Sequence, residues 1–305
     1  MSGHSFGKQT GQAVSLHAQV IAPGALRHGF GGTMERFMLS AFADEIDPML
    51  DVQMDVLEKH GIRYIEMRGV DGANISSLTT EQARAVKARL DARGFRVSAL
   101  GSPIGKIGIG EDFEPHLALF RHTLARAAIL EAPFIRMFSF FIPHGEDPGF
   151  YRGEVMRRWT AFIEAAEGCG VVLLHENEKD IYGDTAERCL DLLRTMDCPF
   201  LKATFDPANF VQCGVKTFPE AYNLLREHIV YMHIKDALYE TGRVVPAGEG
   251  EGRVADILRA LKDTGWNGFL SLEPHLADSL PGGGPDQFAV AAGALEGLLD
   301  RIGRD

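Results

Sequence analysis

The sequence of 305 residues has few cysteines and no long apolar run. Its four cysteines form no CxxC pair and lack zinc-ribbon spacing, which argues against a disulfide-stapled scaffold and a Cys-rich structural metal site. No apolar stretch approaches the roughly 18 residues that a membrane-spanning helix needs. These absences predict a cytoplasmic protein with reduced thiols and no membrane partner.

A surplus of positive charge is also missing, since the formal net charge is −11. Nucleic acids bind proteins largely through basic surfaces, so this balance disfavours DNA or RNA as a partner. Hydrophobic residues make up 45% of the chain and charged residues 24%, a composition that buries a sizeable core. The composition therefore predicts an ordinary globular protein that acts on small molecules.

The N-terminal segment differs from the rest of the chain. It is rich in Gly, Ser, Gln and His, shows no clear periodicity, and lacks the charged and apolar regions of an export signal. We expect residues 1–35 to be a disordered extension and residues 36–305 to be one catalytic domain. There are two alternatives for the extension. The biological start is Met34 or Met38, or the segment is an arm that reaches a partner subunit.

From Phe37 onward, short apolar segments alternate with longer amphipathic ones, as in strand–helix units around a parallel sheet. Eight segments fit strands, at 38–42, 63–67, 96–100, 134–138, 171–175, 203–205, 230–234 and 269–272. Helical patterns follow them at 48–60, 80–93, 114–130, 154–169, 185–196, 219–227, 254–264 and 286–302. Glycines at 61, 94, 170 and 265 suit helix ends. Eight units in this length predict a single α/β domain, a (β/α)8 TIM barrel, rather than an open doubly wound sheet.

Metal-competent side chains stand at the ends of four consecutive predicted strands. They are Glu176, Asp206, His233 and Glu273, each about one strand–helix unit from the next. Neighbouring strands lie about 4.8 Å apart, and TIM-barrel chemistry occupies the carboxyl ends of the strands, so these four can converge on one ion. A single strand-terminal glutamate is more often solvated or salt-bridged. Four candidates in register favour a site for Mn²⁺, Mg²⁺, Co²⁺ or Zn²⁺, with the oxygen-rich set leaning toward Mn²⁺ or Mg²⁺.

Five short motifs follow the predicted strands in order. They are HEN at 175–177, FDPAN at 205–209, VYMHIKD at 230–236, GEG at 248–250 and LEP at 272–274. In this order they resemble the xylose isomerase-like TIM barrels, a sugar phosphate isomerase/epimerase superfamily that includes ketose 3-epimerases, inosose dehydratases and, more distantly, endonuclease IV. The resemblance covers roughly residues 37–302.

The resemblance implies one divalent ion, Mn²⁺ first, held by the four residues Glu176, Asp206, His233 and Glu273. It further implies that Glu176 and Glu273 are catalytic: one takes a proton from the carbon next to a carbonyl and the other returns one, through a metal-stabilised enediolate. A free carboxylate is too weak a base for such a carbon acid at neutral pH, so a Lewis acid on the carbonyl oxygen is needed. The implied activity is that of a metal-dependent isomerase or epimerase of a keto-sugar or sugar derivative. A dehydratase of the inosose or dehydroshikimate type shares the proton-abstraction step and remains the alternative.

Five residues are candidates for substrate binding: Glu66, Asn209, Lys235, Arg136 and His275. Asn209 stands where similar epimerases usually carry histidine, and the arginine expected after the histidine at 233 has no clear match. Asn209 can still hydrogen-bond hydroxyls, Lys235 can hold a carbonyl or carboxylate, and Glu66 can bind a hydroxyl. Arg136 either meets an anionic substrate group or pairs with a nearby carboxylate.

The remaining signals have structural as well as functional interpretations. His175 should point away from the barrel lumen by strand alternation and therefore pack. Glu178 either lines the pocket or lies in a solvated loop. The glycine-rich segment 105–110 lacks the spacing of a phosphate loop, and the aromatic segment 139–143 is either a lid or core.

Two rival functions are also considered. Phosphodiester cleavage would need additional histidine ligands and a basic groove, which the sequence does not show. A non-catalytic binding protein is disfavoured because all four candidate ligands are retained. TIM barrels often assemble, so a homodimer or homotetramer is expected.

Overall fold

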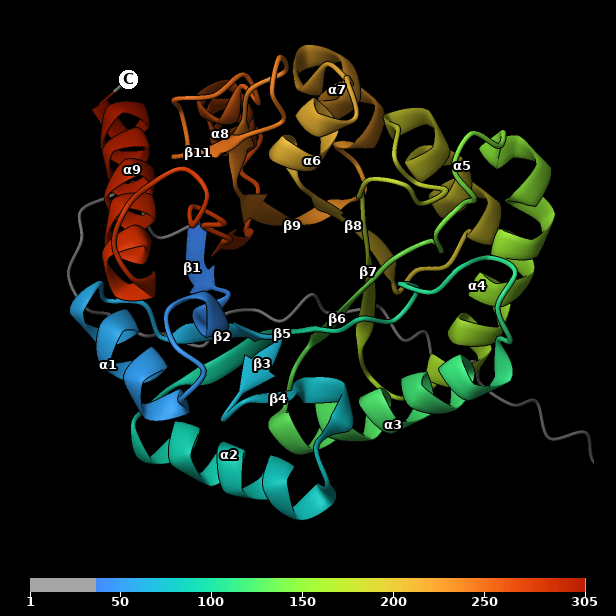
Figure 1. Cartoon of the computed structure of the whole chain (residues 1–305), viewed down its shortest axis with the longest axis horizontal. Helices are drawn as coiled ribbons and strands as arrows, with labels where there is room; N and C mark the ends of the chain where they lie inside the picture. Colours follow the sequence, from blue (N-terminus) through green and yellow to red (C-terminus); the bar gives the residue numbers. More distant parts are fainter. Residues whose placement is uncertain (1–36, 305) are drawn as a thin grey trace, which may run out of the picture. The chain divides into compact units, whose positions relative to one another are not determined.

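The computed structural model describes residues 37–304, so the predicted extension over residues 1–35 lies outside the described part of the chain. Eight parallel strands close into a barrel in the order β1-β12-β9-β8-β7-β6-β5-β2 (Figure 1). Their bounds are β1 Phe37–Ala41, β2 Tyr64–Met67, β5 Arg96–Gly101, β6 Phe134–Met137, β7 Val172–Glu176, β8 Leu201–Phe205, β9 Ile229–Ile234 and β12 Gly268–Leu272. Every predicted strand overlaps one of these, which confirms the single (β/α)8 barrel.

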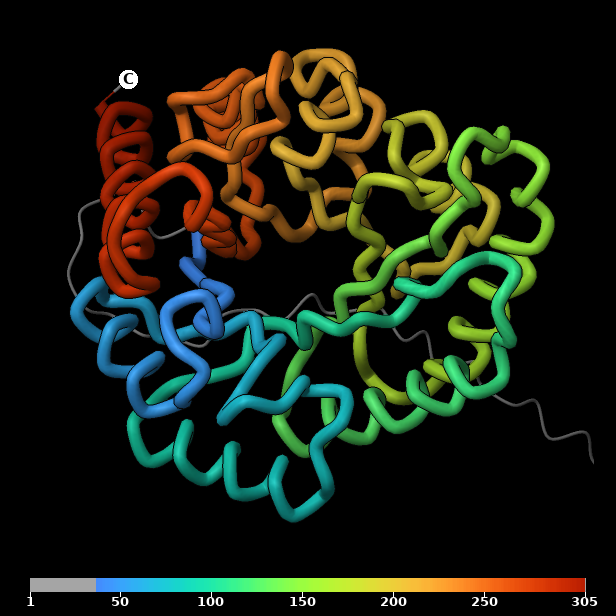
Figure 2. Tube along the Cα trace, in the orientation of Figure 1, coloured from blue at the N-terminus to red at the C-terminus, as the bar shows by residue number. Residues whose placement is uncertain are grey.

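Helices surround the strands as an outer ring (Figure 2). They are α1 Leu50–Lys59, α2 Thr80–Ala92, α3 Glu114–Leu130, α4 Arg152–Ala166, α5 Ala186–Met196, α6 Pro207–Gln212, α7 Tyr222–Leu225, α8 Val254–Asp263 and α9 Gly284–Arg304. The glycines predicted to end helices at 61, 94, 170 and 265 all have positive φ angles, between 68° and 73°. No helix within residues 37–304 is both long and apolar enough to cross a membrane.

The structure adds short elements that periodicity did not predict. Two small hairpins pair β3 Gly69–Val70 with β4 Ala73–Asn74 and β10 Asp236–Ala237 with β11 Val244–Val245. Short helical turns occupy η2 Ala43–Glu45, η3 Ile75–Ser77, η4 Pro148–Tyr151 and the π-type segment η5 Thr217–Ala221. The predicted helix 219–227 is divided between the end of η5 and α7, and Phe218 before it has extended backbone angles, as residues that precede proline often do.

The barrel interior is filled by layers of side chains that lead up to the carboxyl ends of the strands. The lowest layer is an aromatic cluster with ring centroids 5.0 to 6.2 Å apart, formed by Tyr64, Phe134, Tyr231 and Phe269. The hydroxyl of Tyr231 lies 2.8 Å from that of Ser98, which lies 2.6 Å from that of Ser40. His233 follows Tyr231 by two residues and points into the same lumen, with the two ring centroids 6.0 Å apart. The next layer therefore begins at His233.

Candidate metal centre

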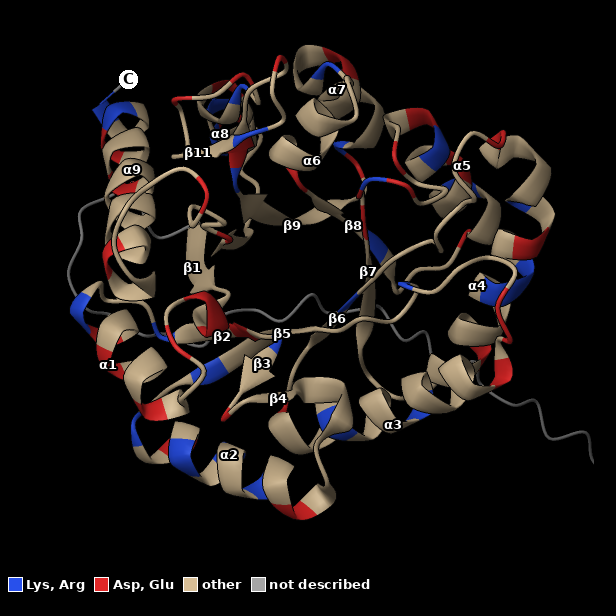
Figure 3. Cartoon of the chain, viewed as in Figure 1, with Lys and Arg blue, Asp and Glu red and all other residues tan. Residues whose placement is uncertain are grey.

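The four predicted ligands meet at the carboxyl end of the barrel. Glu176 ends β7, Asp206 follows β8, His233 lies in β9 and Glu273 follows β12, so they come from four neighbouring strands. One ligand atom from each lies within 4.8 Å of the other three, and all four residues are buried. Figure 3 shows acidic and basic segments inside the ring of helices, on or just after the barrel strands. The four residues therefore lie together in the structure, and their role as metal ligands stays a prediction.

The two ring nitrogens of His233 face different side chains. Its Nδ1 lies 3.0 Å from Oε1 of Glu176, 3.6 Å from Oδ2 of Asp206 and 3.7 Å from Oε2 of Glu273. Its Nε2 lies 3.2 and 3.3 Å from the two oxygens of Glu66, which is fully buried. A carboxylate on one ring nitrogen is the usual way to orient a histidine that ligates through the other. Nδ1 is therefore the nitrogen that faces the ligand oxygens.

Glu176 is held through both of its oxygens. Oε1, which faces His233, accepts a hydrogen bond from Nδ2 of Asn209 at 3.1 Å. Oε2 accepts one from Nη1 of Arg136 at 3.0 Å. Burial alone would raise the pKa of Glu176, but the charges of His233 and Arg136 lower it to about 2. The carboxylate is thus ionised and fixed in orientation.

Asp206 uses only one oxygen for folding. Oδ1 accepts the backbone N–H of Asn209 at 2.9 Å and so caps α6, whose first residue is Pro207. The side chain of Asn177 makes two 2.9 Å hydrogen bonds to the Asp206 backbone and holds the turn. Oδ2 is buried without a hydrogen bond and lies 2.9 Å from Nζ of Lys235. A buried carboxylate oxygen left in this state is available to a metal ion.

Glu273 faces cations on both sides. Its Oε2 accepts a 2.6 Å hydrogen bond from Nζ of Lys235. Its Oε1 lies 3.4 Å from Nη1 of Arg68 and 3.5 Å from Nε2 of His275. Burial would raise the pKa of Glu273, but Lys235, His275 and His233 hold it well below its usual value. Burial would likewise lower the pKa of Lys235, yet Asp206 and Glu273 hold it well above the usual range.

The residues present fit a divalent ion. Three carboxylate oxygens and one imidazole nitrogen face one point, one of the oxygens lacks a hydrogen bond, and all four side chains are buried. Hard divalent cations and zinc accept this donor set. The sequence-based ligand set therefore stands as a coherent candidate centre.

The five predicted substrate-binding residues fall into two groups. Glu66 and Asn209 point at predicted ligands, His233 and Glu176 respectively, and are almost completely buried. Lys235, Arg136 and His275 also contact the predicted glutamate ligands but carry positive or titratable charge. Of the two interpretations of Arg136, the structure shows the carboxylate pair with Glu176.

Several residues beside the four candidate ligands were not predicted from the sequence. Arg68 follows Glu66 by two on the same strand face, a period-2 signal that could have identified it. Its guanidinium lies 4.7 Å from the ring centroid of Phe42, while that of Arg136 lies 5.3 Å from Phe42 and 4.6 Å from Phe138. The two arginines therefore share one aromatic support beside the cluster. A Cβ on Gly101 would lie 2.7 Å from Phe42, so this close packing requires glycine.

The other residues and segments that the sequence singled out have structural contacts within residues 37–304. His175 is buried, lies 3.0 Å from the hydroxyl of Ser139 and packs edge-on against Trp159, in agreement with its predicted packing role. In the segment 105–110, the backbone N–H groups of Gly105 and Gly108 donate to side chains of this chain, which disfavours a phosphate loop. Phe140 is fully buried, so the segment 139–143 contributes to the core at this residue.

Glu178, the remaining signal, stands at the edge of the cluster. Its Oε2 accepts a 3.1 Å hydrogen bond from Nζ of Lys106, whose ammonium lies 4.2 Å from the ring centroid of Phe138. Its side chain is 16% exposed, so it lies at a rim rather than in a solvated loop.

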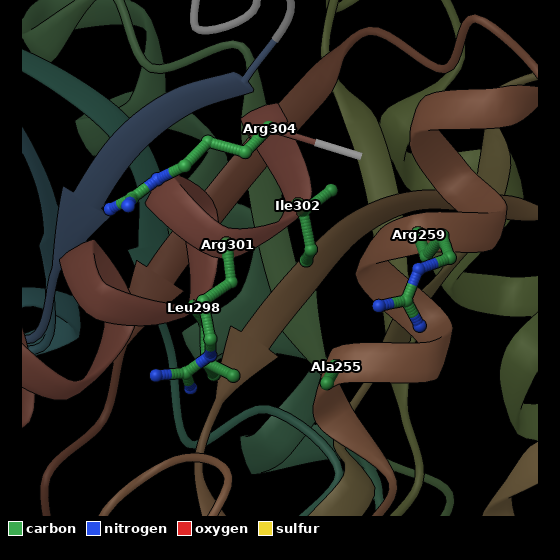
Figure 4. A pocket seen from close by; sticks show the side chains of 6 residues that line it. All are labelled: Ala255, Arg259, Leu298, Arg301, Ile302 and Arg304. Atoms are coloured by element: carbon green, nitrogen blue, oxygen red, sulfur yellow. The ribbon is translucent and has the colours of Figure 1, made fainter.

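A separate cavity of about 320 Å³ lies between α8 and α9, away from the four predicted ligands (Figure 4). It is lined by Ala255, Arg259, Leu298, Arg301, Ile302 and Arg304. None of these side chains is a carboxylate, imidazole or thiol. The cavity therefore offers no ligands for a cation, and the chemistry of interest remains at the barrel end.

The fold agrees with comparisons to known proteins. A family model described as xylose isomerase-like TIM barrel matches residues 54–296. The IOLI protein with a bound zinc atom is similar in structure, with a TM-score of 0.71, 16% identity, and coverage of 87% of this chain and 99% of that one. No curated protein matches the chain.

Two further solved structures are similar at low sequence identity. The probable 3-DHS dehydratase AsbF from Bacillus anthracis has a TM-score of 0.68 and 19% identity, and the match covers 86% of this chain and 98% of that one. D-psicose 3-epimerase from Clostridium cellulolyticum, solved with D-tagatose, has a TM-score of 0.63 and 17% identity, covering 87% and 95%. At such identities the likeness shows a shared fold.

Proposed function

The chain belongs to the xylose isomerase-like TIM barrel family, and from this premise we propose that it is a divalent-metal-dependent sugar isomerase or epimerase. Its substrate is a keto-sugar or sugar derivative, and the reaction removes a proton next to a carbonyl to give an enediolate. The observation that carries the proposal is the convergence of Glu176, Asp206, His233 and Glu273 in one buried cluster. D-psicose 3-epimerase, a structural neighbour, is a member of the same reaction class.

Two glutamates in one cluster give the chain a base and an acid. Glu176 and Glu273 lie on different strands and each leaves one oxygen away from His233, so each has an oxygen for proton transfer and one for ligation. When bound, the divalent ion supplies the Lewis acidity that makes a carbon acid beside a carbonyl accessible to a carboxylate. We propose Mn²⁺ from the oxygen-rich donor set, while IOLI carries zinc.

The predicted substrate-binding residues take different roles in this proposal. Lys235, Arg136 and His275 bring positive charge to the cluster, and we propose that oxygen atoms of the substrate are bound beside them. Glu66 and Asn209 hydrogen-bond predicted ligands, and we propose that they position His233 and Glu176 rather than bind hydroxyls. A homo-oligomer and a cytoplasmic location stay predictions from the sequence.

A dehydratase that uses the same cluster is the second candidate. The cations Arg136 and Lys235 beside the ligands favour it, because they would pair with a substrate carboxylate. AsbF, a structural neighbour, is named as a probable 3-DHS dehydratase. Both candidates start with the same proton abstraction and differ in whether a proton returns or a hydroxyl leaves.

Deuterium exchange tests the shared step directly. Protein stripped with chelator and protein reloaded with Mn²⁺ would each be incubated in D₂O with a panel of keto-sugars, cyclitol ketones and dehydroshikimate, and followed by NMR. We expect Mn²⁺-dependent deuterium at the carbon beside the carbonyl of one panel member. An epimerised product then supports the epimerase and loss of water supports the dehydratase. Exchange that proceeds equally without any metal would contradict the proposal.

A further inference from the structure

The side-chain ammonium of Lys235 lies within the set of predicted metal ligands. Nζ is 2.6 Å from Oε2 of Glu273 and 2.9 Å from Oδ2 of Asp206. These are the same two oxygens that face Nδ1 of His233, at 3.7 and 3.6 Å. Lys235 therefore contacts two of the four atoms that would ligate an ion.

The two arginines of the site contact oxygens that do not face His233. Arg136 donates to Oε2 of Glu176, whereas Oε1 is the oxygen that faces His233. Arg68 approaches Oε1 of Glu273, whereas Oε2 faces His233. These two arginines can keep their contacts while the inner oxygens hold an ion. Lys235 differs, because its two contacts are to inner oxygens.

Burial makes a cation at this position necessary. Glu176, Asp206 and Glu273 are at most 3% exposed, and a buried carboxylate without a partner is strongly destabilising. Lys235, itself 5% exposed, neutralises the two carboxylates that Arg136 does not contact. It thereby keeps the inner oxygens in place without a metal ion.

We propose that Lys235 is a built-in counter-ion that holds the ligand set together in the metal-free protein and is displaced from it when a divalent ion binds. The inference rests on the proposed metal centre and concerns how readily that centre takes up and releases its ion. The ammonium stabilises the metal-free state and competes with the ion, so the protein releases and regains metal without unfolding its site. The affinity for the ion is consequently lower than the four ligands alone would give.

The test compares Lys235→Met with Lys106→Met in the full chain. Met keeps most of the aliphatic length and removes the charge. Lys106 is the matched control, because it pairs with Glu178 on the same face of the barrel but contacts none of the four predicted ligands in the described structure. The dissociation constant for Mn²⁺ would be measured by calorimetry, and the melting temperature would be measured with and without Mn²⁺.

We expect Lys235→Met to bind Mn²⁺ about tenfold more tightly or better, since a like charge next to the ion is removed. Its metal-free form should melt several degrees below the wild type, and saturating Mn²⁺ should remove that deficit. Lys106→Met should change both quantities little. Should Lys235→Met not fold without metal, Lys235→Gln, which can still hydrogen-bond the carboxylates, is expected to show the same tighter binding.

Two results would overturn the inference. Weaker or unchanged Mn²⁺ binding in both Lys235 variants would mean that the ammonium does not compete with the ion for the ligand oxygens. Weaker binding would show instead that the ammonium orients the ligands. A metal-free Lys235→Met protein as stable as the wild type would mean that the ammonium does not hold the set together. Both failures leave the proposed function intact if the wild type binds Mn²⁺, whereas a wild type that binds no divalent ion fails the proposed metal centre itself.

Discussion

Two buried aspartates follow neighbouring strands of the barrel, Asp206 after β8 and Asp236 after β9, and the protein satisfies them in opposite ways. Asp236 accepts four backbone N–H groups, from Ala237, Gly248, Gly250 and Gly252, at 2.7 to 3.2 Å. Asp206 receives one backbone N–H on Oδ1, while Oδ2 faces two side chains, the ammonium of Lys235 at 2.9 Å and Nδ1 of His233 at 3.6 Å. Both are fully buried, so exposure does not distinguish them.

The difference separates a structural anchor from an exchangeable ligand. The loop around Asp236 is shaped to the carboxylate, since a Cβ on Gly250 would lie 2.4 Å from its Oδ1 and one on Gly252 would lie 2.7 Å from it. Backbone donors cannot leave without unfolding the loop, so this carboxylate has no capacity for a metal ion. A side-chain cation can move, so Oδ2 of Asp206 can exchange its partner. The partner of a buried carboxylate, rather than its burial, thus indicates function.

The largest effect is expected from Glu273→Gln, which changes a carboxylate that, like Asp206, has the movable ammonium of Lys235 as a partner. Its carboxylate is proposed to transfer the substrate proton, so deuterium exchange should fall about 10³-fold. Folding should persist, because within residues 37–304 only side chains donate hydrogen bonds to the Glu273 carboxylate. Full exchange by a metal-loaded, folded variant would rule out the two-glutamate mechanism.

Asp236→Asn should damage the fold instead. The amide nitrogen would face backbone N–H donors and leave at least one of them unpaired, which costs about 3 kcal/mol of unfolding free energy. For a protein of this size, the melting temperature should fall by roughly 6–12 °C. Mn²⁺ should raise the melting temperature of the variant and of the wild type by similar amounts. An unaltered melting temperature would remove the distinction between the two aspartates.

Glu66→Gln should give a smaller effect. Glutamine keeps the size of the side chain but weakens the carboxylate contact that orients Nε2 of His233, so Mn²⁺ affinity should drop about 10- to 100-fold. NMR of the imidazole nitrogens should also show a loss of the preference for a proton on Nε2, which a merely structural role would not change. Unchanged affinity together with an unchanged tautomer would return Glu66 to a role in substrate binding.

The sequence predicts the barrel, and the meeting of the four candidate ligands at one end of it, because both depend on local patterns. Period-2 strands identify which side chains face the lumen, and each ligand stands at a strand end. The level of a residue along the barrel axis depends on the register between strands, which one sequence does not contain. Glu66 illustrates this, since the β2–β5 register shifts between Ile65 and Glu66, and the side chain lies beside His233.

Hydrogen bonds made by backbone groups also cannot be predicted from patterns of side chains. The segment GEG at 248–250 is part of the family resemblance, but only the structure shows that its N–H groups surround Asp236. The support of Arg68 and Arg136 by Phe42 likewise brings β6 together with residues that directly follow β1 and β2. Such contacts arise only when the barrel closes.

Metal content shows whether the four side chains form one exchangeable metal centre. Wild type and Asp206→Asn would be stripped, reloaded with Mn²⁺, passed through a desalting column and analysed for manganese per chain, with circular dichroism as the check on folding. We expect about one Mn²⁺ per wild-type chain and little in a folded Asp206→Asn protein. Equal manganese in both proteins, or none in the wild type, would contradict it.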